Sequence, residues 1–256
     1  ASLNRRFGMN YTAGHIFPTS GCAGAVAHAL RAVTKPGDKV LVQAPFFPEY
    51  IPYINDTGAQ IEIIPARFED FQINFEALEQ MLQPGVAAIL INSPNNPSGV
   101  AYTGETLEKL SSLLAAKSKE LGYNLFLISD EPYREIAFGG REIPYPARFY
   151  PHTLTCYSFS KSLSVPGERI GYVAVCPECE HAEDIVPMCG QISRGIGHNC
   201  PSSLIQLAAA EAVDDTADLS VYETNMELLY ETFRELGFAV KKPDGTFYIM
   251  PKALEE

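Results

Sequence analysis

The sequence predicts an α/β protein in which helices cover both faces of a mainly parallel sheet. Short, continuous apolar runs such as 87–91 and 125–128 are typical of strands that are buried on both faces. Segments with apolar residues at helical spacing separate these runs along the chain. Alternation of such strands and helices favours a parallel sheet between two helical layers, so we expect a three-layer fold.

The first part of the chain follows this alternation after residues 1–18, which give no clear element. Apolar residues recur on one face from Gly21 to Val33, which predicts a helix that the Lys-Pro-Gly-Asp run at 35–38 ends. Asn74 can cap a further helix that reaches Leu82. The other elements expected here are a strand at 39–43, a short helix at 48–56 and a strand at 60–65.

The middle of the chain continues the same pattern. Thr103 can cap a long amphipathic helix that Gly122 ends. The apolar runs on either side of this helix, and those further along, have the length of buried strands. The strands expected here are 87–91, 125–128, 154–157 and 170–175.

The end of the chain indicates the start of a second domain. The elements expected here are a helix at 204–213, a long helix at 219–236 and a hairpin that pairs 238–240 with 247–250. An acidic, polar run at 214–218 separates the first helix from the rest. We therefore expect a large domain over 1–213 and the incomplete start of a smaller α+β domain over 214–256.

The composition limits the class of protein. With 256 residues and 46% hydrophobic content, the chain can bury the core of one large domain. Its formal net charge of −12 argues against a nucleic-acid partner, which would need a basic surface. No apolar run approaches the length of a membrane span, and scattered cysteines are typical of reduced thiols. We therefore expect a cytoplasmic protein that has no membrane partner.

A zinc site is the metal centre that the residue types suggest. Cys176, Cys179, His181 and Cys189 carry the sulfur and nitrogen ligands that zinc prefers. Only one close pair of cysteines exists, and it follows a predicted strand as a surface turn would. We therefore expect no metal.

The segment 158–169 carries the clearest chemistry. Lys161 lies just after a predicted core strand, where partial loss of hydration helps an amine to lose its proton and react with an aldehyde. Ser158 and Ser160 place hydroxyl donors beside it. Arg169 offers a fork of donors that is suited to a phosphate. An imine-forming amine beside a phosphate clamp indicates pyridoxal 5'-phosphate (PLP).

The stretch 158–172, which reads SFSKSLSVPGERIGY, resembles the lysine segment of fold-type I PLP enzymes, most closely the class I and II aminotransferases. The resemblance implies the three-layer PLP-dependent transferase-like fold. It also implies that Lys161 carries the cofactor as a Schiff base and that Arg169, eight residues later, holds the phosphate. The alternative is a surface lysine in a serine-rich loop, and the motifs below argue against it.

Two motifs resemble the parts of this family that hold the phosphate and the ring of the cofactor. The helix start at 19–25 is built from small residues, and free N–H groups at a helix N-terminus bind phosphate. The resemblance places these main-chain contacts on Gly21, Cys22 and Ala23. The second motif is the Pro-Phe-Phe-Pro run at 45–48, where the resemblance places the aromatic ring that stacks on the pyridine at Phe47. Without the resemblance, both phenylalanines would be interpreted as core residues.

Two further motifs follow predicted strands. The turn SPNNPSG at 93–99 resembles the family's Asn-Pro-Ser/Thr-Gly turn, which implies that Asn96 donates to the phenolic oxygen of the cofactor. The motif SDEPY resembles the segment whose carboxylate, here Asp130, keeps the pyridine nitrogen protonated. Tyr133 would then contact the phenolic oxygen. Without the resemblance, a simple turn and a helix-capping Asp would explain these motifs.

The loop at 192–201 carries a weaker resemblance to a segment that crosses the dimer interface in this family. It implies that Asn199 reaches the cofactor of a homodimer partner. Arg194 lies where some family members bind a substrate carboxylate, although a surface arginine explains it equally well.

The resemblance implies a PLP-dependent aminotransferase whose substrates are an amino acid and a 2-keto acid. It leaves open a PLP-dependent lyase or decarboxylase on the same fold, or a non-catalytic PLP-binding regulatory domain. The family's amino-terminal tyrosine and carboxy-terminal arginine have no counterpart in this sequence. We therefore expect the isolated chain to bind PLP and to transaminate poorly.

Overall fold

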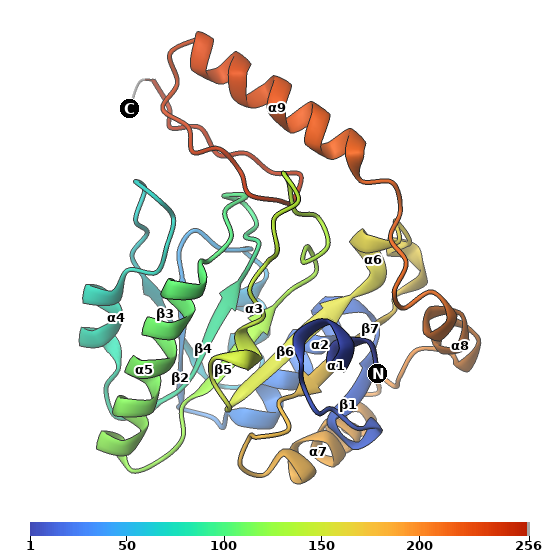
Figure 1. Ribbon diagram of the computed structural model, residues 1–256. Coiled ribbons are helices and arrows are strands. Elements are labelled where there is room, and N and C mark those ends of the chain that lie inside the picture. Colours follow the sequence, from blue (N-terminus) through green and yellow to red (C-terminus); the bar gives the residue numbers. More distant parts are fainter. Residues whose placement is uncertain (255–256) are drawn as a thin grey trace.

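The computed structural model, which describes residues 1–254, is built on one seven-stranded sheet with the order β1-β7-β6-β5-β4-β2-β3 (Figure 1). Its strands are β1 Ile16–Thr19, β2 Lys39–Gln43, β3 Gln60–Ile64, β4 Val86–Asn92, β5 Phe126–Asp130, β6 Thr153–Ser158 and β7 Gly171–Val175. Only β7 runs antiparallel to its neighbours, β6 and β1. The predicted mainly parallel sheet is therefore confirmed.

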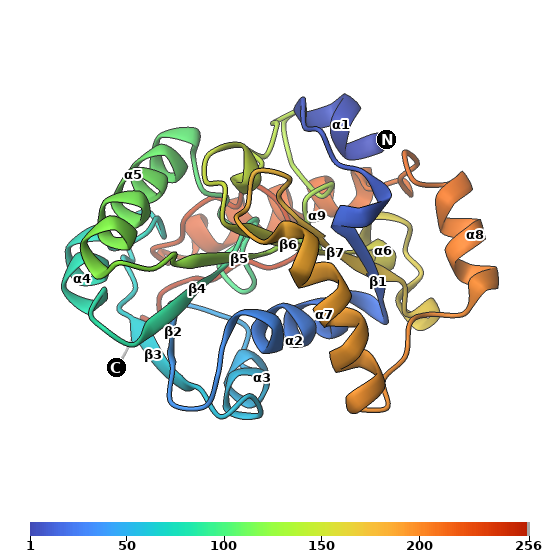
Figure 2. The same ribbon diagram turned by 90° about the horizontal axis from the view of Figure 1, so that it is seen from below.

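Helices cover the sheet on both sides, as Figure 2 shows, with α2, α3 and α7 on one face and α4 and α5 on the other. The helices are α1 Ser2–Phe7, α2 Gly21–Val33, α3 Tyr50–Asn55, α4 Phe75–Met81, α5 Gly104–Leu121, α6 Phe159–Ser162, α7 Ala182–Gly195, α8 Ser203–Glu211 and α9 Ser220–Glu235. The side chains of Asn74 and Thr103 accept hydrogen bonds from the first turns of α4 and α5, as their capping role predicts. The expected three-layer fold is confirmed.

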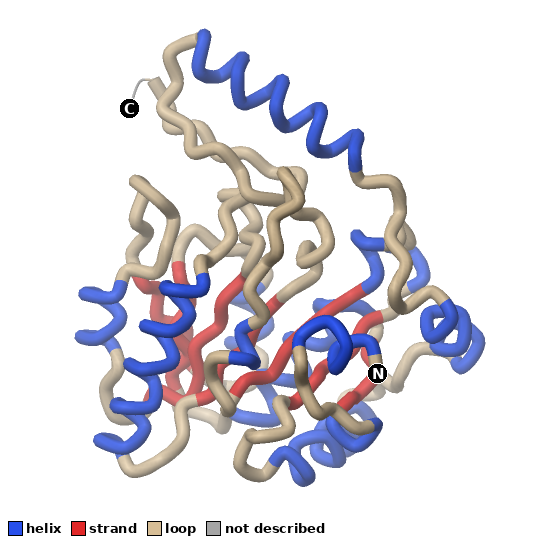
Figure 3. Tube along the Cα trace, in the orientation of Figure 1, coloured by secondary structure: helices blue, strands red, loops and turns tan. Residues whose placement is uncertain are grey.

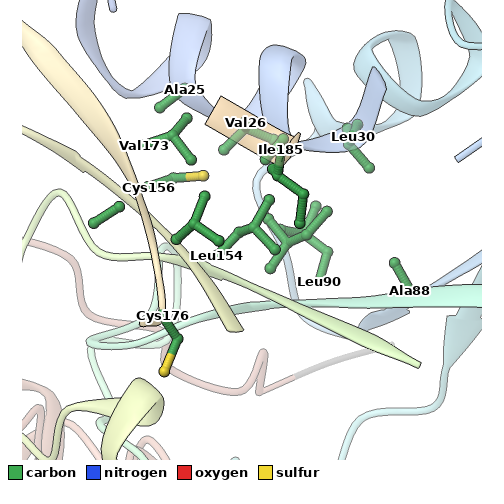
Figure 4. Packing of buried hydrophobic residues seen from close by; sticks show 14 of the residues in the cluster. Ala25, Val26, Leu30, Ala88, Leu90, Leu154, Cys156, Val173, Cys176 and Ile185 are labelled. Atoms are coloured by element: carbon green, nitrogen blue, oxygen red, sulfur yellow. The ribbon is translucent and has the colours of Figure 1, made fainter. Parts of the chain in front are cut away.

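Alternation along the strands divides the core into two layers. Leu90 packs toward α2, whereas its neighbours Ile89 and Ile91 pack toward α4 and α5. Figure 4 shows Val26 and Leu30 of α2 directed at the sheet residues on their side. Each central strand is thus buried on both faces, which explains why its apolar run is continuous.

Four of these helices and strands were not predicted from the sequence: α1, β1, α6 and α7. Pro18 lies within β1, which is tolerated because β1 is an edge strand and its pairing is with β7 alone. Pro187 lies inside α7, where proline normally argues against a helix. The loop expected from residue 192 is therefore helical up to Gly195.

The predicted hairpin that pairs 238–240 with 247–250 is wrong. Figure 3 draws the chain after α9 as loop, and the described pairings there are isolated bridges of Val240 with Pro251 and of Gly245 with Ala137. Residues 244–246 donate instead to the carbonyl oxygens of Gly99 and Ile136. The boundary at 213/214 stays a prediction.

Within residues 1–254, no helix combines the length and the apolar character that crossing a bilayer requires.

The N-terminus of α2 lies directly against β7. A Cβ atom on Gly171 would come within 2.4 Å of the Tyr157 carbonyl oxygen and within 2.9 Å of the Gly21 carbonyl carbon. Such distances require the backbone to move. Only glycine therefore lets α2 start this close to the strand pair β6 and β7.

We predict that Gly171→Ala lowers the free energy of unfolding by roughly 1–3 kcal/mol, because a methyl group has no space between two backbones. Urea denaturation monitored by circular dichroism measures the change. Gly190→Ala in α7 is the matched control, since the nearest atom to its Cβ is a Phe17 ring carbon at 3.8 Å. Equal stability of the two variants would contradict this packing argument.

Candidate active site at the carboxyl edge of the sheet

A cavity of about 230 Å³ lies where the parallel strands end. Asn92, Asp130 and Ser158 are the last residues of β4, β5 and β6, and all three line it. Every site residue predicted from the sequence lines this cavity except Gly21 and Asn199. The lining residues are Cys22, Ala23, Val26, Phe47, Tyr50, Tyr53, Asn92, Asn96, Asp130, Pro132, Tyr133, Ser158, Ser160, Lys161, Pro166, Arg169 and Tyr248.

Lys161 lies in the short helix α6, which begins directly after β6. The buried Tyr157 hydroxyl donates to Ser162 at 2.9 Å and so ties the strand to this helix. The Lys161 Nζ atom lies 5.3 Å from the centre of the Phe247 ring. The end of β6 therefore fixes the backbone of Lys161, which lines the cavity.

Arg169 lies against the N-terminus of α2. Its guanidinium donates to the carbonyl oxygens of Pro166 and Ser20 at 3.0 and 3.2 Å. A Cβ atom on Gly21 would lie 2.7 Å from Arg169 Nη2, and Gly21 has a φ of +77°, so glycine is required there on both counts. Gly21 itself does not line the cavity, but it lets the arginine approach the first turn of α2.

The cations at this end of the cavity lack carboxylate partners. Within residues 1–254, the contacts of Lys161 and Arg169 are an aromatic ring and main-chain carbonyls, with no carboxylate in ion-pair range. Ser158 and Ser160 are buried beside them and also line the cavity. Two cations, two hydroxyl groups and a helix N-terminus together favour an anion such as a phosphate.

Asp130 is buried on the opposite wall, and donors from two helices hold it. The Cys22 thiol donates to Oδ1 at 2.6 Å, and the Tyr50 hydroxyl donates to Oδ2 at 2.5 Å. Burial raises the pKa of Asp130 to about 6, although both hydrogen bonds oppose this rise. Asp130 is thus an anion at neutral pH that would gain from a nearby positive charge.

Asn96 and Tyr133 lie together on a third wall. The Asn96 main-chain N–H donates to Asn92 Oδ1 at 2.6 Å, and Asn92 Nδ2 donates to the Asp130 carbonyl oxygen at 2.8 Å. These bonds join the turn after β4 to the end of β5. Burial raises the pKa of the Tyr133 hydroxyl, and the neighbouring Asn96 side chain lowers it.

The segment 243–248 contributes Tyr248 to the cavity lining, which the sequence analysis does not predict. The Tyr133 hydroxyl donates to the Tyr248 hydroxyl at 3.4 Å. The Asp244 and Gly245 N–H groups donate to the Gly99 carbonyl oxygen at 2.9 and 3.1 Å. A contact with a glycine so far away in sequence leaves no local signal in this segment.

Asn199 and Arg194 do not join this site. Asn199 is exposed in the loop after α7, and Arg194 is exposed in the last turn of that helix. Neither of them lines the cavity. Conversely, Tyr50, Asn92 and Tyr248 line it although the sequence analysis did not select them. Phe47 lines it and stands edge-on to Tyr50, with ring centres 5.8 Å apart.

Comparison with protein families identifies one match over almost the whole chain. The family described as "Aminotransferase class I and II" matches residues 3–256. A probable N-acetyl-LL-diaminopimelate aminotransferase of Bacillus subtilis (strain 168) is 29% identical over 97% of this chain and 62% of the relative. A probable aspartate/prephenate aminotransferase of Aquifex aeolicus is 30% identical over 95% of this chain and 62% of the relative.

Solved structures give the same result. An aminotransferase from Eubacterium rectale superposes with a TM-score of 0.97 and 43% identity over 99% of this chain and 64% of that one. Aspartate aminotransferase from Thermotoga maritima superposes with a TM-score of 0.87 and 28% identity, over 99% of this chain and 65% of that one. The chain thus spans less than two thirds of the length of these proteins.

The raised pKa of Asp130 predicts a pH-dependent contribution to stability. Because the folded protein favours the protonated carboxyl, stability is lost as the pH rises from the ordinary value of 3.8 through about 6. The amide that Asp130→Asn introduces does not titrate, so the stability of the parent relative to this variant should fall by about 3 kcal/mol across this window. Urea denaturation at several pH values measures the difference. Asp215→Asn, at an exposed position, is the control. The prediction would be refuted if the unfolding free energies of Asp130→Asn and Asp215→Asn changed equally with pH.

Proposed function

The chain belongs to the class I and II aminotransferase family, and on this premise we propose that it forms the cofactor-binding part of a PLP-dependent aminotransferase. The proposed reaction moves an amino group between an amino acid and a 2-keto acid. The observation that carries the proposal is that Lys161, Arg169 and Asp130 line one cavity although they come from separate parts of the chain.

The residues present fit PLP at each of its polar groups. The unpaired Arg169, the buried Ser158 and Ser160 and the first turn of α2 suit the phosphate. The missing Cβ at Gly21 leaves room for this cradle, because any larger residue would collide with Arg169. Asp130, which is buried without a cation, suits a pyridinium nitrogen.

The remaining walls suit the ring and its oxygen. Phe47 offers an aromatic ring to the cavity, on which a pyridine ring can stack. Asn96 and Tyr133 offer polar groups close to each other, as a shared phenolic oxygen would require. When bound, PLP supplies an aldehyde that takes up amino groups and a protonated ring that accepts electrons.

In the proposed mechanism, Lys161 transfers a proton and Asp130 supplies a negative charge. Lys161 Nζ would take the proton from the Cα atom of the substrate amino acid and would give it up at the former aldehyde carbon of the bound cofactor. The helix α6 keeps this amine in place at the end of β6. Asp130 stays ionised at neutral pH and keeps a proton on the ring nitrogen, since an anion beside a pyridine favours its charged form.

The names of the relatives favour transamination over the alternatives. Those quoted above are aminotransferases, whereas a lyase, a decarboxylase or a regulatory domain finds no support among them. Their names differ in substrate, so we propose the substrate class and not one amino acid. Arg194 is left without an assigned role.

We further propose that the protein acts in the cytoplasm as a homodimer. The support for the compartment is that all six cysteines are free. The support for the dimer is the family resemblance of the Asn199 loop, which is exposed and does not line the cavity of its own chain.

We predict that the protein expressed from its complete reading frame converts an amino acid and 2-oxoglutarate into a keto acid and glutamate. Lys161→Ala should slow turnover by roughly 10²–10⁴-fold, because the proton-transfer group is lost. Lys109→Ala, which removes the same charge from the surface of α5, is the control. Product analysis by mass spectrometry checks the reaction, and a cleaved or decarboxylated product would replace this proposal by the lyase alternative.

A further inference from the structure

Cys22 makes a contact that the family resemblance does not require of it. The resemblance gives this position a main-chain role, yet its side chain donates to Asp130 Oδ1 at 2.6 Å. Cys22 is the second residue of α2, so its thiol reaches the carboxylate from the same helix end that faces Arg169. One turn of helix thus contacts both ends of the cavity.

We propose that the Cys22 thiol is a positioning residue that holds the Asp130 carboxylate ionised and directed into the cavity. This inference rests on the proposed function, because it concerns the carboxylate that would face the ring nitrogen. The thiol acts through Asp130 and is not itself proposed to react.

The geometry leaves Asp130 free to accept a third donor. A carboxylate offers about four lone-pair sites on its two oxygens. Cys22 occupies one on Oδ1, and Tyr50 occupies one on Oδ2. The two donors therefore fix the plane of the carboxylate from α2 and α3, while each oxygen keeps a lone pair for a group in the cavity.

The thiol is a permanent donor in this position. Burial raises the pKa of Cys22 well above its ordinary value, and the neighbouring Asp130 raises it further. The thiol therefore stays protonated throughout the range in which Asp130 ionises. This property also separates Cys22 from redox-active cysteines, which need a lowered pKa to react.

No cation replaces the donor if it is lost. Within the described chain, the titratable groups that influence or touch Asp130 are thiols and phenols whose pKa values burial raises, so they are neutral. They come from α2, α3, β6 and the turn after β5, namely Cys22, Tyr50, Tyr53, Cys156 and Tyr133. Lys161 and Arg169 line the same cavity and have no ion pair with Asp130.

The experiment follows the titration of Asp130 by NMR in the cofactor-free chain with ¹³Cγ-labelled aspartate. Asp130→Asn identifies the resonance by its disappearance. We expect the midpoint of Asp130 in Cys22→Ala to lie about one pH unit above that of the parent, because a hydrogen bond to the charged form is lost. Cys22→Ser keeps a donor and should leave the midpoint at or below the parent value.

The controls separate this role from simple packing. Cys189→Ala removes a buried thiol from α7 that makes no hydrogen bond to Asp130, and it should leave the midpoint unchanged. If Cys22→Ala does not fold, Cys22→Val fills a similar volume without a donor and takes its place. A midpoint in these donor-free variants equal to that of the parent would overturn the inference.

A second measurement separates this inference from the proposed function. In the complete enzyme, the acidic limb of the kcat/KM profile should move to higher pH in Cys22→Ala and return in Cys22→Ser, with the plateau above it retained. If the parent is active and the acidic limb of Cys22→Ala lies at the same pH as that of the parent, the positioning role would be overturned. A parent that does not transaminate would refute the proposed function, while the NMR midpoint would still decide whether Cys22 holds Asp130.

Discussion

The close approach of α2 to the strand pair β6 and β7 is the constraint on which the site depends. A Cβ atom on Gly171 would collide with the backbones of Tyr157 and Gly21, and one on Gly21 would collide with the Arg169 guanidinium. This contact brings the helix N-terminus beside Arg169 and carries Cys22 to Asp130. A helix displaced by the width of a methyl group would separate the positive end of the cavity from its acidic wall.

The parallel sheet supplies the second constraint. Because β4, β5 and β6 run in the same direction in register, their last residues Asn92, Asp130 and Ser158 arrive at one edge. An amide, a carboxylate and a hydroxyl are thereby collected from distant parts of the chain. These polar groups bind opposite charges: the N-terminus of α2 and Arg169 favour an anion in the cavity, whereas Asp130 favours a cation.

Apolar runs in the sequence predicted the site residues whose position depends on the end of a strand. Lys161 and Asp130 follow continuous apolar runs, so the sequence could place them at strand ends. Cys22 and Tyr50 were different, because their role depends on two helices that converge on one carboxylate. The hairpin prediction was wrong for the same reason: Gly245 donates to Gly99 and forms an isolated bridge with Ala137, partners that no short-range turn signal can reveal.

The site at which PLP attaches tests the account most directly. The protein is incubated with PLP, reduced with borohydride, digested and analysed by mass spectrometry. The account predicts a single pyridoxyl group on Lys161, with exposed lysines such as Lys35 unlabelled. A pyridoxyl group on another lysine, with Lys161 unmodified, would contradict it.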